Sequence, residues 1–275
     1  MDHTHKVISK DGTEIVGRVF GQGPALVLLP PGPGESESAW RFLVPYLSNR
    51  FTCYLMNTRG RGLSADHHDH SPAKLVEDVI TFVESIGQSV VLVEAGSGLW
   101  AYSAATNHPG IGAVAVYEPG VDEVMPDTLA KRLEEVFVKV AEFAAEGHLN
   151  EAAGFFIENS HILYTKEELA TGIPKVFWQE AAENIPVFLV EEGEKANSEV
   201  MSPTDRSVLS KIEVPVLLIK GIETTTWFIN SVNYVAEHVN NPYIREIQYA
   251  AHFGIWTHPE CVAEVLEWFY TTKLE

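Results

Sequence analysis

Residues 90–100 read VVLVEAGSGLW, and this stretch decides how the rest of the chain is interpreted. The apolar run 90–93 is typical of a strand that is buried on both faces of a sheet. Small residues follow at 95–98, and alanines at helical spacing occupy 101–105. A chain that turns directly from a strand into a helix needs small residues at the corner. The stretch therefore predicts a strand, a tight turn and a helix in immediate succession.

The same alternation of strands and helices is found on both sides of a helical block. Apolar runs that stop at glycine or proline predict strands near residues 5–9, 14–20, 25–29, 51–56, 114–117, 214–219 and 244–249. Helical spacing predicts helices near residues 40–47, 72–86, 226–238 and 259–270. Strand signals vanish between residues 121 and 205, where helical periodicity takes over and the polar stretch 191–206 predicts a loop. We therefore expect an α/β fold with a doubly wound, mostly parallel sheet of about eight strands. Its core domain comprises residues 1–120 and 206–275, and residues 121–205 form a helical cap, or lid.

Composition narrows the class of protein. The chain has 275 residues, 45% hydrophobic content and a formal charge of −19, which suit a single soluble domain with a sizeable insertion. Such an acidic chain is expected to bind neither nucleic acid nor anionic membranes. Cys53 and Cys261 lie far apart in the sequence and indicate two thiols in a reducing compartment rather than a disulfide. We expect a cytoplasmic protein with a small-molecule substrate, and a homodimer is compatible with the sequence.

Four segments, taken in chain order, resemble motifs of the α/β-hydrolase superfamily. They are LLPPGPG at 28–34, NTRGRGLS at 57–64, the turn at 93–98, and AAHF at 250–253 ahead of a His-Pro-Glu turn. The first resembles the oxyanion loop, although Pro30 replaces the usual histidine. The third resembles the nucleophile elbow, a strained strand-to-helix turn that presents a nucleophile above the sheet. The resemblance spans nearly the whole chain and implies an esterase-like or lactonase-like enzyme that needs no cofactor.

The elbow departs from the superfamily pattern by one residue. Counting from Val93, the nucleophile position falls on Gly96, whereas the serine is Ser97. If the turn shifts by one residue, Ser97 is the nucleophile. If the usual register holds, Gly96 takes the strained position with positive φ and the hydroxyl of Ser97 points elsewhere. Both alternatives remain open, and the first is slightly favoured.

The resemblance also implies where an oxyanion would be held. Gly98 follows the serine, and its N–H would contribute to the oxyanion hole. A second N–H would come from the loop that contains Pro31 and Gly32. These three residues form the expected oxyanion hole.

His252 is the strongest candidate for a catalytic residue. It follows the last predicted strand after two alanines, and an imidazole can accept and return a proton near neutral pH. The resemblance places the acid that orients it after a strand, at Glu118 or in the loop with Glu223. The aspartate usual in that loop is replaced here by Thr224. We favour Glu118 over Glu223.

The substrate is expected to lie between the elbow and the cap. The residues predicted to contact it are Glu94, Gly96, Trp100, Phe137, Phe156, Trp178 and Phe188. Glu94 stands where the superfamily usually has glycine. The histidines at 67–70 resemble a metal cluster, but their spacing matches no known zinc site, so no metal is expected.

Two functions follow from these observations. The first is a cofactor-independent hydrolase of a small to medium, largely apolar ester or lactone, in which Ser97, His252 and Glu118 act together. The alternative is a protein of the same fold without a nucleophile, which binds a small molecule or uses His252 for acid–base chemistry such as a lyase step.

Overall fold

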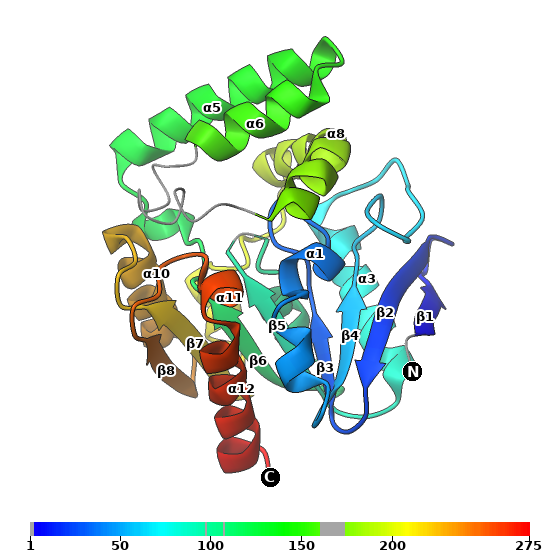
Figure 1. The fold of residues 1–275 in the computed structure, drawn as a ribbon, viewed down its shortest axis with the longest axis vertical. Coiled ribbons are helices and arrows are strands. Elements are labelled where there is room, and N and C mark those ends of the chain that lie inside the picture. The colour runs from blue at the N-terminus through cyan, green and yellow to red at the C-terminus, as the bar shows by residue number, and fades with distance from the viewer. Residues whose placement is uncertain (1–2, 97, 107, 160–173) are drawn as a thin grey trace.

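The computed structural model describes residues 3–96, 98–106, 108–159 and 174–275. Over these residues the chain forms an eight-stranded sheet with the order β1-β2-β4-β3-β5-β6-β7-β8 (Figure 1). The strands are β1 (His3–Ile8), β2 (Glu14–Gly21), β3 (Ala25–Leu28), β4 (Thr52–Met56), β5 (Val90–Ala95), β6 (Ile111–Tyr117), β7 (Val216–Gly221) and β8 (Pro242–Ile247). β2 pairs antiparallel with both of its neighbours, β1 and β4. All the remaining neighbouring pairs in the sheet are parallel. The predicted sheet is confirmed.

Helices cover both faces of the sheet, which explains why its central strands are apolar throughout. One face packs against α3 (Pro72–Ile86), α4 (Trp100–Ala105), α9 (Arg206–Leu209) and α10 (Thr226–His238). The other packs against α1 (Ser36–Trp40), α2 (Val44–Leu47), α11 (Gly254–Thr257) and α12 (Pro259–Lys273). Every residue of β3, β5 and β7 is buried. Because parallel strands in such a layer meet no water, their sequences lack the alternation of a half-exposed strand.

Two local predictions were wrong. The helix expected over 40–47 is two short helices, α1 and α2. Pro45 lies in the first turn of α2 and has no N–H to donate, so a continuous helix is interrupted there. The loop expected over 191–206 is helical up to Asn197, because α8 (Lys175–Asn197) continues through the polar residues. Glutamate, lysine and alanine favour helices, so a polar stretch of this kind does not by itself indicate a loop.

The block 121–205 is helical wherever the structure describes it. It contains the short 3-10 helix η1 (Asp122–Val124) and the helices α5 (Asp127–Ala145), α6 (Leu149–Asn159) and α8. Figure 1 shows α5, α6 and α8 lying across one end of the sheet. The three helices enclose an apolar cluster of their own. No strand occurs in the described part of this block, as expected, whereas its status as a separate cap domain stays a prediction.

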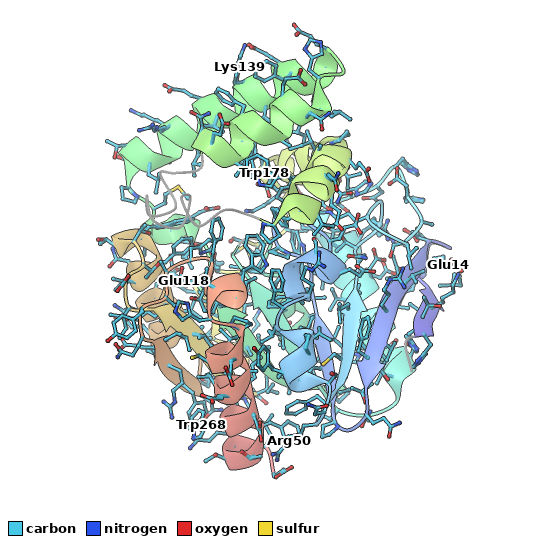
Figure 2. All side chains as sticks on the ribbon, in the orientation of Figure 1. Glu14, Arg50, Glu118, Lys139, Trp178 and Trp268 are labelled. Carbon is cyan, nitrogen blue, oxygen red and sulfur yellow. The ribbon has the colours of Figure 1, made fainter. Side chains whose placement is uncertain are left out.

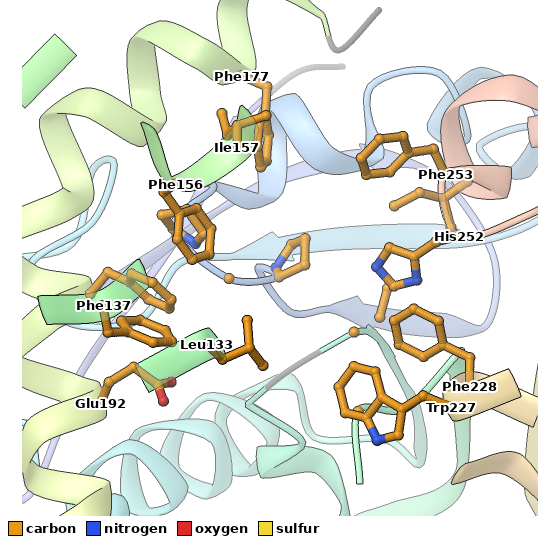
Figure 3. Close-up of a pocket in the computed structure, with 18 of the residues that line it drawn as sticks. Leu133, Phe137, Phe156, Ile157, Phe177, Glu192, Trp227, Phe228, His252 and Phe253 are labelled. Atoms are coloured by element: carbon orange, nitrogen blue, oxygen red, sulfur yellow. The ribbon is translucent and has the colours of Figure 1, made fainter. Parts of the chain in front are cut away.

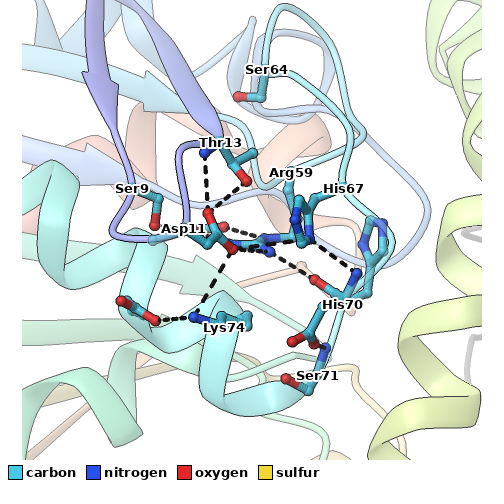
Figure 4. Close-up of polar contacts among 12 residues, drawn as sticks. Ser9, Asp11, Thr13, Arg59, Ser64, His67, His70, Ser71 and Lys74 are labelled. Carbon is cyan, nitrogen blue, oxygen red and sulfur yellow. Dashed lines mark hydrogen bonds and ion pairs between the residues drawn. The ribbon is translucent and has the colours of Figure 1, made fainter.

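A buried arginine ties the loop after β4 to the first hairpin and to α3 (Figure 4). Arg59 is fully buried, and its Nε and Nη2 donate to the two carboxylate oxygens of Asp78 at 2.7 and 2.8 Å. Its Nη1 donates to Asp11 at 2.9 Å and to the carbonyl of Asp69 at 2.7 Å. Ser9 donates to the same carboxylate of Asp78. This network holds the loop next to the predicted oxyanion segment in a fixed position.

We expect Arg59→Met to lower the free energy of unfolding by about 3–5 kcal/mol, because the variant leaves Asp78 buried without its cation. Urea unfolding followed by circular dichroism measures the loss. The matched control is Arg50→Met, at a site beside the C-terminal helix α12 (Figure 2). Arg50 is 41% exposed in its ion pair with Glu267, so its removal should cost less than about 1 kcal/mol. Equal losses in the two variants would contradict a structural role for the Arg59 network.

Candidate active site

The strand-to-helix turn after β5 has Gly96 at its apex. Gly96 has φ +70°, its N–H donates to Tyr117 O at 3.1 Å, and its carbonyl accepts from Gly120 N at 2.8 Å. A Cβ on Gly96 would lie 3.7 Å from Nε2 of His252. The residue at the apex in the usual register of an elbow is therefore glycine, and its α-carbon faces the histidine.

The described residues between the apex and α4 also have positive φ. Gly98 has φ +102° and Leu99 has φ +58°, and α4 begins only at Trp100. Ser97 lies outside the described residues, so its predicted role as nucleophile stays a prediction.

The predicted contact between His252 and Glu118 is present. Nδ1 of His252 lies 2.9 Å from Oε2 of Glu118, which is fully buried at the end of β6. Because a carboxylate only accepts, neutral His252 carries its proton on Nδ1. Nε2, on the side of Gly96, is then the atom that can accept a proton from a reacting group.

The loop that contains Glu223, the alternative candidate for the acid, donates hydrogen bonds to Glu118. Gly221 N donates to Oε1 of Glu118 at 2.9 Å, and the hydroxyl of Thr224 donates to Oε2 at 2.8 Å. Glu223 is exposed to solvent. Thr224, at the position where the superfamily usually has the acid, thus serves as a donor to a carboxylate that comes from the neighbouring strand.

Two contacts fix the orientation of the histidine. The hydroxyl of Tyr117, the last residue of β6, donates to Ala251 O at 2.6 Å and holds the turn before His252. The ring of Phe228 stacks on the imidazole with 4.1 Å between centroids and 4° between planes. An imidazole held by a carboxylate at one edge and a ring on one face has little rotational freedom.

His252 lies at one end of an apolar cavity of about 190 Å³ (Figure 3). Its walls come from the sheet end, from α10, from the histidine turn, and from α5, α6 and α8. Of the predicted substrate contacts, it is lined by Gly96, Phe137, Phe156 and Phe188. Aromatic residues missed by the sequence analysis also line it: Phe177, Trp227, Phe228, Phe253 and Trp256. Phe253 and Trp256 follow the histidine motif closely, which was the available signal.

The structure places three predicted contacts away from this cavity. Trp178 lies on α8 in the helical layer (Figure 2) and is not among the residues that line the cavity. Trp100 lines a second, smaller cavity beside Gly98. Glu94 is fully buried beneath the turn, where its two oxygens accept from Trp100 N at 3.2 Å and Ala101 N at 3.1 Å. Burial raises the pKa of Glu94 to about 8, although these backbone donors oppose the shift.

The loop after β3 has one candidate donor for an oxyanion. Pro31 has no N–H, so it can shape the loop but cannot donate. The N–H of Gly34 donates to Pro31 O at 3.0 Å. Gly32, which has φ +48° and lines the cavity, therefore supplies the N–H of this loop that could face a reacting oxygen. Gly98 lines the smaller cavity rather than the larger one.

Neither a metal centre nor a membrane segment was found in the described part of the chain. No group of three or more potential ligands there has the geometry to hold a metal ion. His70 instead contacts Asp66 at 2.9 Å, and His67 stacks against His68. No helix among the described residues is long and apolar enough to cross a bilayer.

Comparison with solved structures identifies the fold. An α/β hydrolase from Sphaerobacter thermophilus superposes with a TM-score of 0.75 over 97% of this chain and 100% of its own, at 21% identity. An esterase from a Rhodococcus species gives 0.78 over 98% of both chains at 16% identity. An enol-lactonase from Burkholderia xenovorans gives 0.75 over 97% of this chain and 100% of its own at 18% identity. No protein-family model and no curated protein matches the sequence. At these identities the likeness establishes the fold and leaves the reaction to be argued from the site.

Glu94 should make stability fall as the pH rises. Its pKa is about 8 in the folded chain against an ordinary value of 4.5, so the folded state holds a proton that the unfolded chain has released. The stability is therefore full below pH 4.5 and is lost as the pH rises through about 8. Other groups share this direction, Glu180 among them, whose pKa burial raises to about 7.

We expect Glu94→Gln to flatten the fall in melting temperature between pH 5 and pH 9. Glu135→Gln, which alters an exposed carboxylate on α5, should leave the slope of the parent protein unchanged. Differential scanning calorimetry across this range measures both slopes. An unchanged slope in Glu94→Gln would show that Glu94 is ionised in the folded state at neutral pH.

Proposed function

Because the chain has the α/β-hydrolase fold, we propose that it hydrolyses a small, largely apolar ester or lactone. The observation that carries the proposal is the 2.9 Å contact between His252 and Glu118, with Nε2 directed toward the turn apex and the apolar cavity. A histidine oriented in this way is a general base for a reaction at a carbonyl. Solved structures of the same fold include esterases and an enol-lactonase, which supports this class of substrate.

The first form of the mechanism passes through a covalent intermediate. His252 takes the proton of the Ser97 hydroxyl as its oxygen attacks the carbonyl carbon, and the negative charge develops on the carbonyl oxygen. The N–H group of Gly32, which lines the cavity next to His252, would stabilise that charge. His252 then gives the proton to the leaving alcohol. In the second half of the reaction His252 takes a proton from water as the water oxygen attacks the acyl carbon. It then returns that proton to the Ser97 oxygen as the acid is released.

The cavity limits the size of the substrate. A cavity of about 150 Å³ holds one benzene molecule. The cavity next to His252, at about 190 Å³, therefore suits a ring or short chain with few substituents. Its walls are mainly apolar, whereas Glu192 and Lys195 lie on α8 among its polar residues (Figure 3 shows Glu192 at the far end from His252).

We expect His252→Ala to lower the turnover of p-nitrophenyl butyrate by about 10³-fold or more, because the base is lost. Glu118→Gln should cause a loss of similar order, since an amide cannot hold the imidazole in the same tautomer. Ester hydrolysis and thermal melting, measured together, separate lost chemistry from lost folding. His148→Ala, at an exposed site between α5 and α6, is the matched control and should keep full activity. Retained turnover in His252→Ala would exclude the proposed role.

Gly96 favours a second candidate, acid–base chemistry by His252 without a covalent intermediate. A glycine at the apex leaves the space beneath Nε2 without a side chain from that residue. A water molecule or a substrate hydroxyl held there would lose its proton to His252 directly. If the group is water, the hydroxide that forms would attack the carbonyl. If it is a substrate hydroxyl, its deprotonation would start a lyase reaction.

Variants of Ser97 and Gly96 discriminate between the two forms. In the covalent form, Ser97→Ala should reduce ester turnover by orders of magnitude, and a fluorophosphonate should label the parent protein. In the second form, Ser97→Ala should be nearly silent, whereas Gly96→Ala should be damaging because it adds a methyl group at positive φ, 3.7 Å from Nε2. Mass spectrometry of the labelled protein and initial rates of the three proteins decide the outcome. The covalent route would be excluded if Ser97→Ala kept full activity and the fluorophosphonate labelled neither this variant nor the parent protein.

A further inference from the structure

A small polar chamber adjoins the main cavity behind the loop after β3. It has a volume of about 20 Å³, and the charged or hydroxyl-bearing side chains that line it are Thr58, Arg61, Glu191 and Glu192. Gly32, Phe188 and Glu192 line both the chamber and the main cavity, so the two spaces share a wall. A space of this volume can hold one oxygen-sized group.

The chamber is built from polar side chains that are almost completely buried. Thr58 is 2% exposed, Arg61 3% and Glu191 6%. Arg61 donates through Nη1 to the carbonyls of Gly32 and Gly34, and through Nη2 to Glu191. The charge of Arg61 is therefore matched within the chamber by the carboxylate of Glu191.

Each of these three side chains still has one polar atom without a partner. Oγ1 of Thr58, Nε of Arg61 and Oε1 of Glu191 are buried and have no hydrogen-bond partner within the described part of the chain. A buried polar atom without a partner costs stability, and the three side chains that carry these atoms all line the same small space, which favours a polar group as its occupant. They offer two donors and one charged acceptor.

This set of atoms selects one kind of ligand group. A hydroxyl oxygen can accept from Arg61 Nε–H and from the Thr58 hydroxyl, and can donate its hydrogen to Glu191 Oε1. A carbonyl oxygen would leave Glu191 unsatisfied, a carboxylate would face the charge of Glu191, and an ammonium would face the N–H of Arg61. Water also fits the donor and acceptor set, and it would fill the chamber when no substrate is bound.

We propose that the chamber is a hydroxyl subsite, so that the preferred substrates of the proposed hydrolase carry a hydroxyl group close to the reacting carbonyl. The position follows from Gly32, the candidate oxyanion donor, which lines both spaces. This inference rests on the proposed function for the identity of the carbonyl group. It does not depend on which nucleophile attacks.

Binding of matched amides tests the subsite without any turnover. Mandelamide and phenylacetamide have the same skeleton and differ only in the hydroxyl next to the carbonyl. We expect the parent protein to bind mandelamide at least about 10-fold more tightly, because a site built to hydrogen-bond a hydroxyl rejects the analogue that lacks it. Isothermal calorimetry measures both dissociation constants.

Thr58→Val removes one of the three partners with little change of shape, and we expect it to reduce the preference several-fold. Thr58→Ser keeps the hydroxyl and should keep the preference. Thr81→Val is the matched control, because the buried hydroxyl of Thr81 also has no partner among the described residues but lies on α3 and lines neither cavity. It should leave both dissociation constants unchanged.

Equal affinity of the parent protein for the two amides, including no measurable binding of either, would overturn the subsite. So would a Thr58→Val variant that weakens both amides equally, since the chamber would then hold only a structural water. Hydrolysis of methyl mandelate and methyl phenylacetate is measured separately. If both esters are hydrolysed without preference, the subsite proposal is wrong and the proposed function stands. If the protein distinguishes the two amides but hydrolyses no ester, the subsite is supported and the proposed function is contradicted.

Discussion

The Glu118 carboxylate contacts three hydrogen-bonding groups that come from two segments about 100 or more residues further along the chain. They come from the end of β7 at Gly221, from the loop at Thr224 and from the ring of His252. A fully buried carboxylate is tolerated only when its oxygens are satisfied, so these segments must meet at one point for the chain to fold. The same contacts that satisfy the carboxylate also orient the imidazole. Folding and the alignment of the candidate base therefore depend on one group.

The turn beneath the histidine is stabilised in an unusual way. In this chain α4 begins at Trp100, and its first N–H groups donate to the carboxyl oxygens of Glu94. Those groups would otherwise offer partial positive charge at the start of the helix. The chain thus provides an internal acceptor for this end of the helix.

Apolar runs and the order of the turns predicted the sheet and the place of His252, because both depend on local patterns that survive in any context. The contact between Glu118 and His252 was also predictable, since the ends of parallel strands meet at one edge, but this argument alone does not separate Glu118 from Glu223. The direction of Glu94 was not, because the sequence does not say on which side of a turn a side chain lies. The aromatic residues Trp227 and Phe228 were missed for a related reason: at helical spacing, such residues are more often core than binding site.

Arg61 connects the loop after β3 to α8, next to the contacts that α8 also makes through Asn184 and Phe177. Through one nitrogen it holds the carbonyls of the loop with Gly32, and through another it holds Glu191 on α8. Any displacement of α8 would therefore have to break this ion pair or move the loop with it. The arginine thus couples the position of α8 to the shape of the loop that contains Gly32.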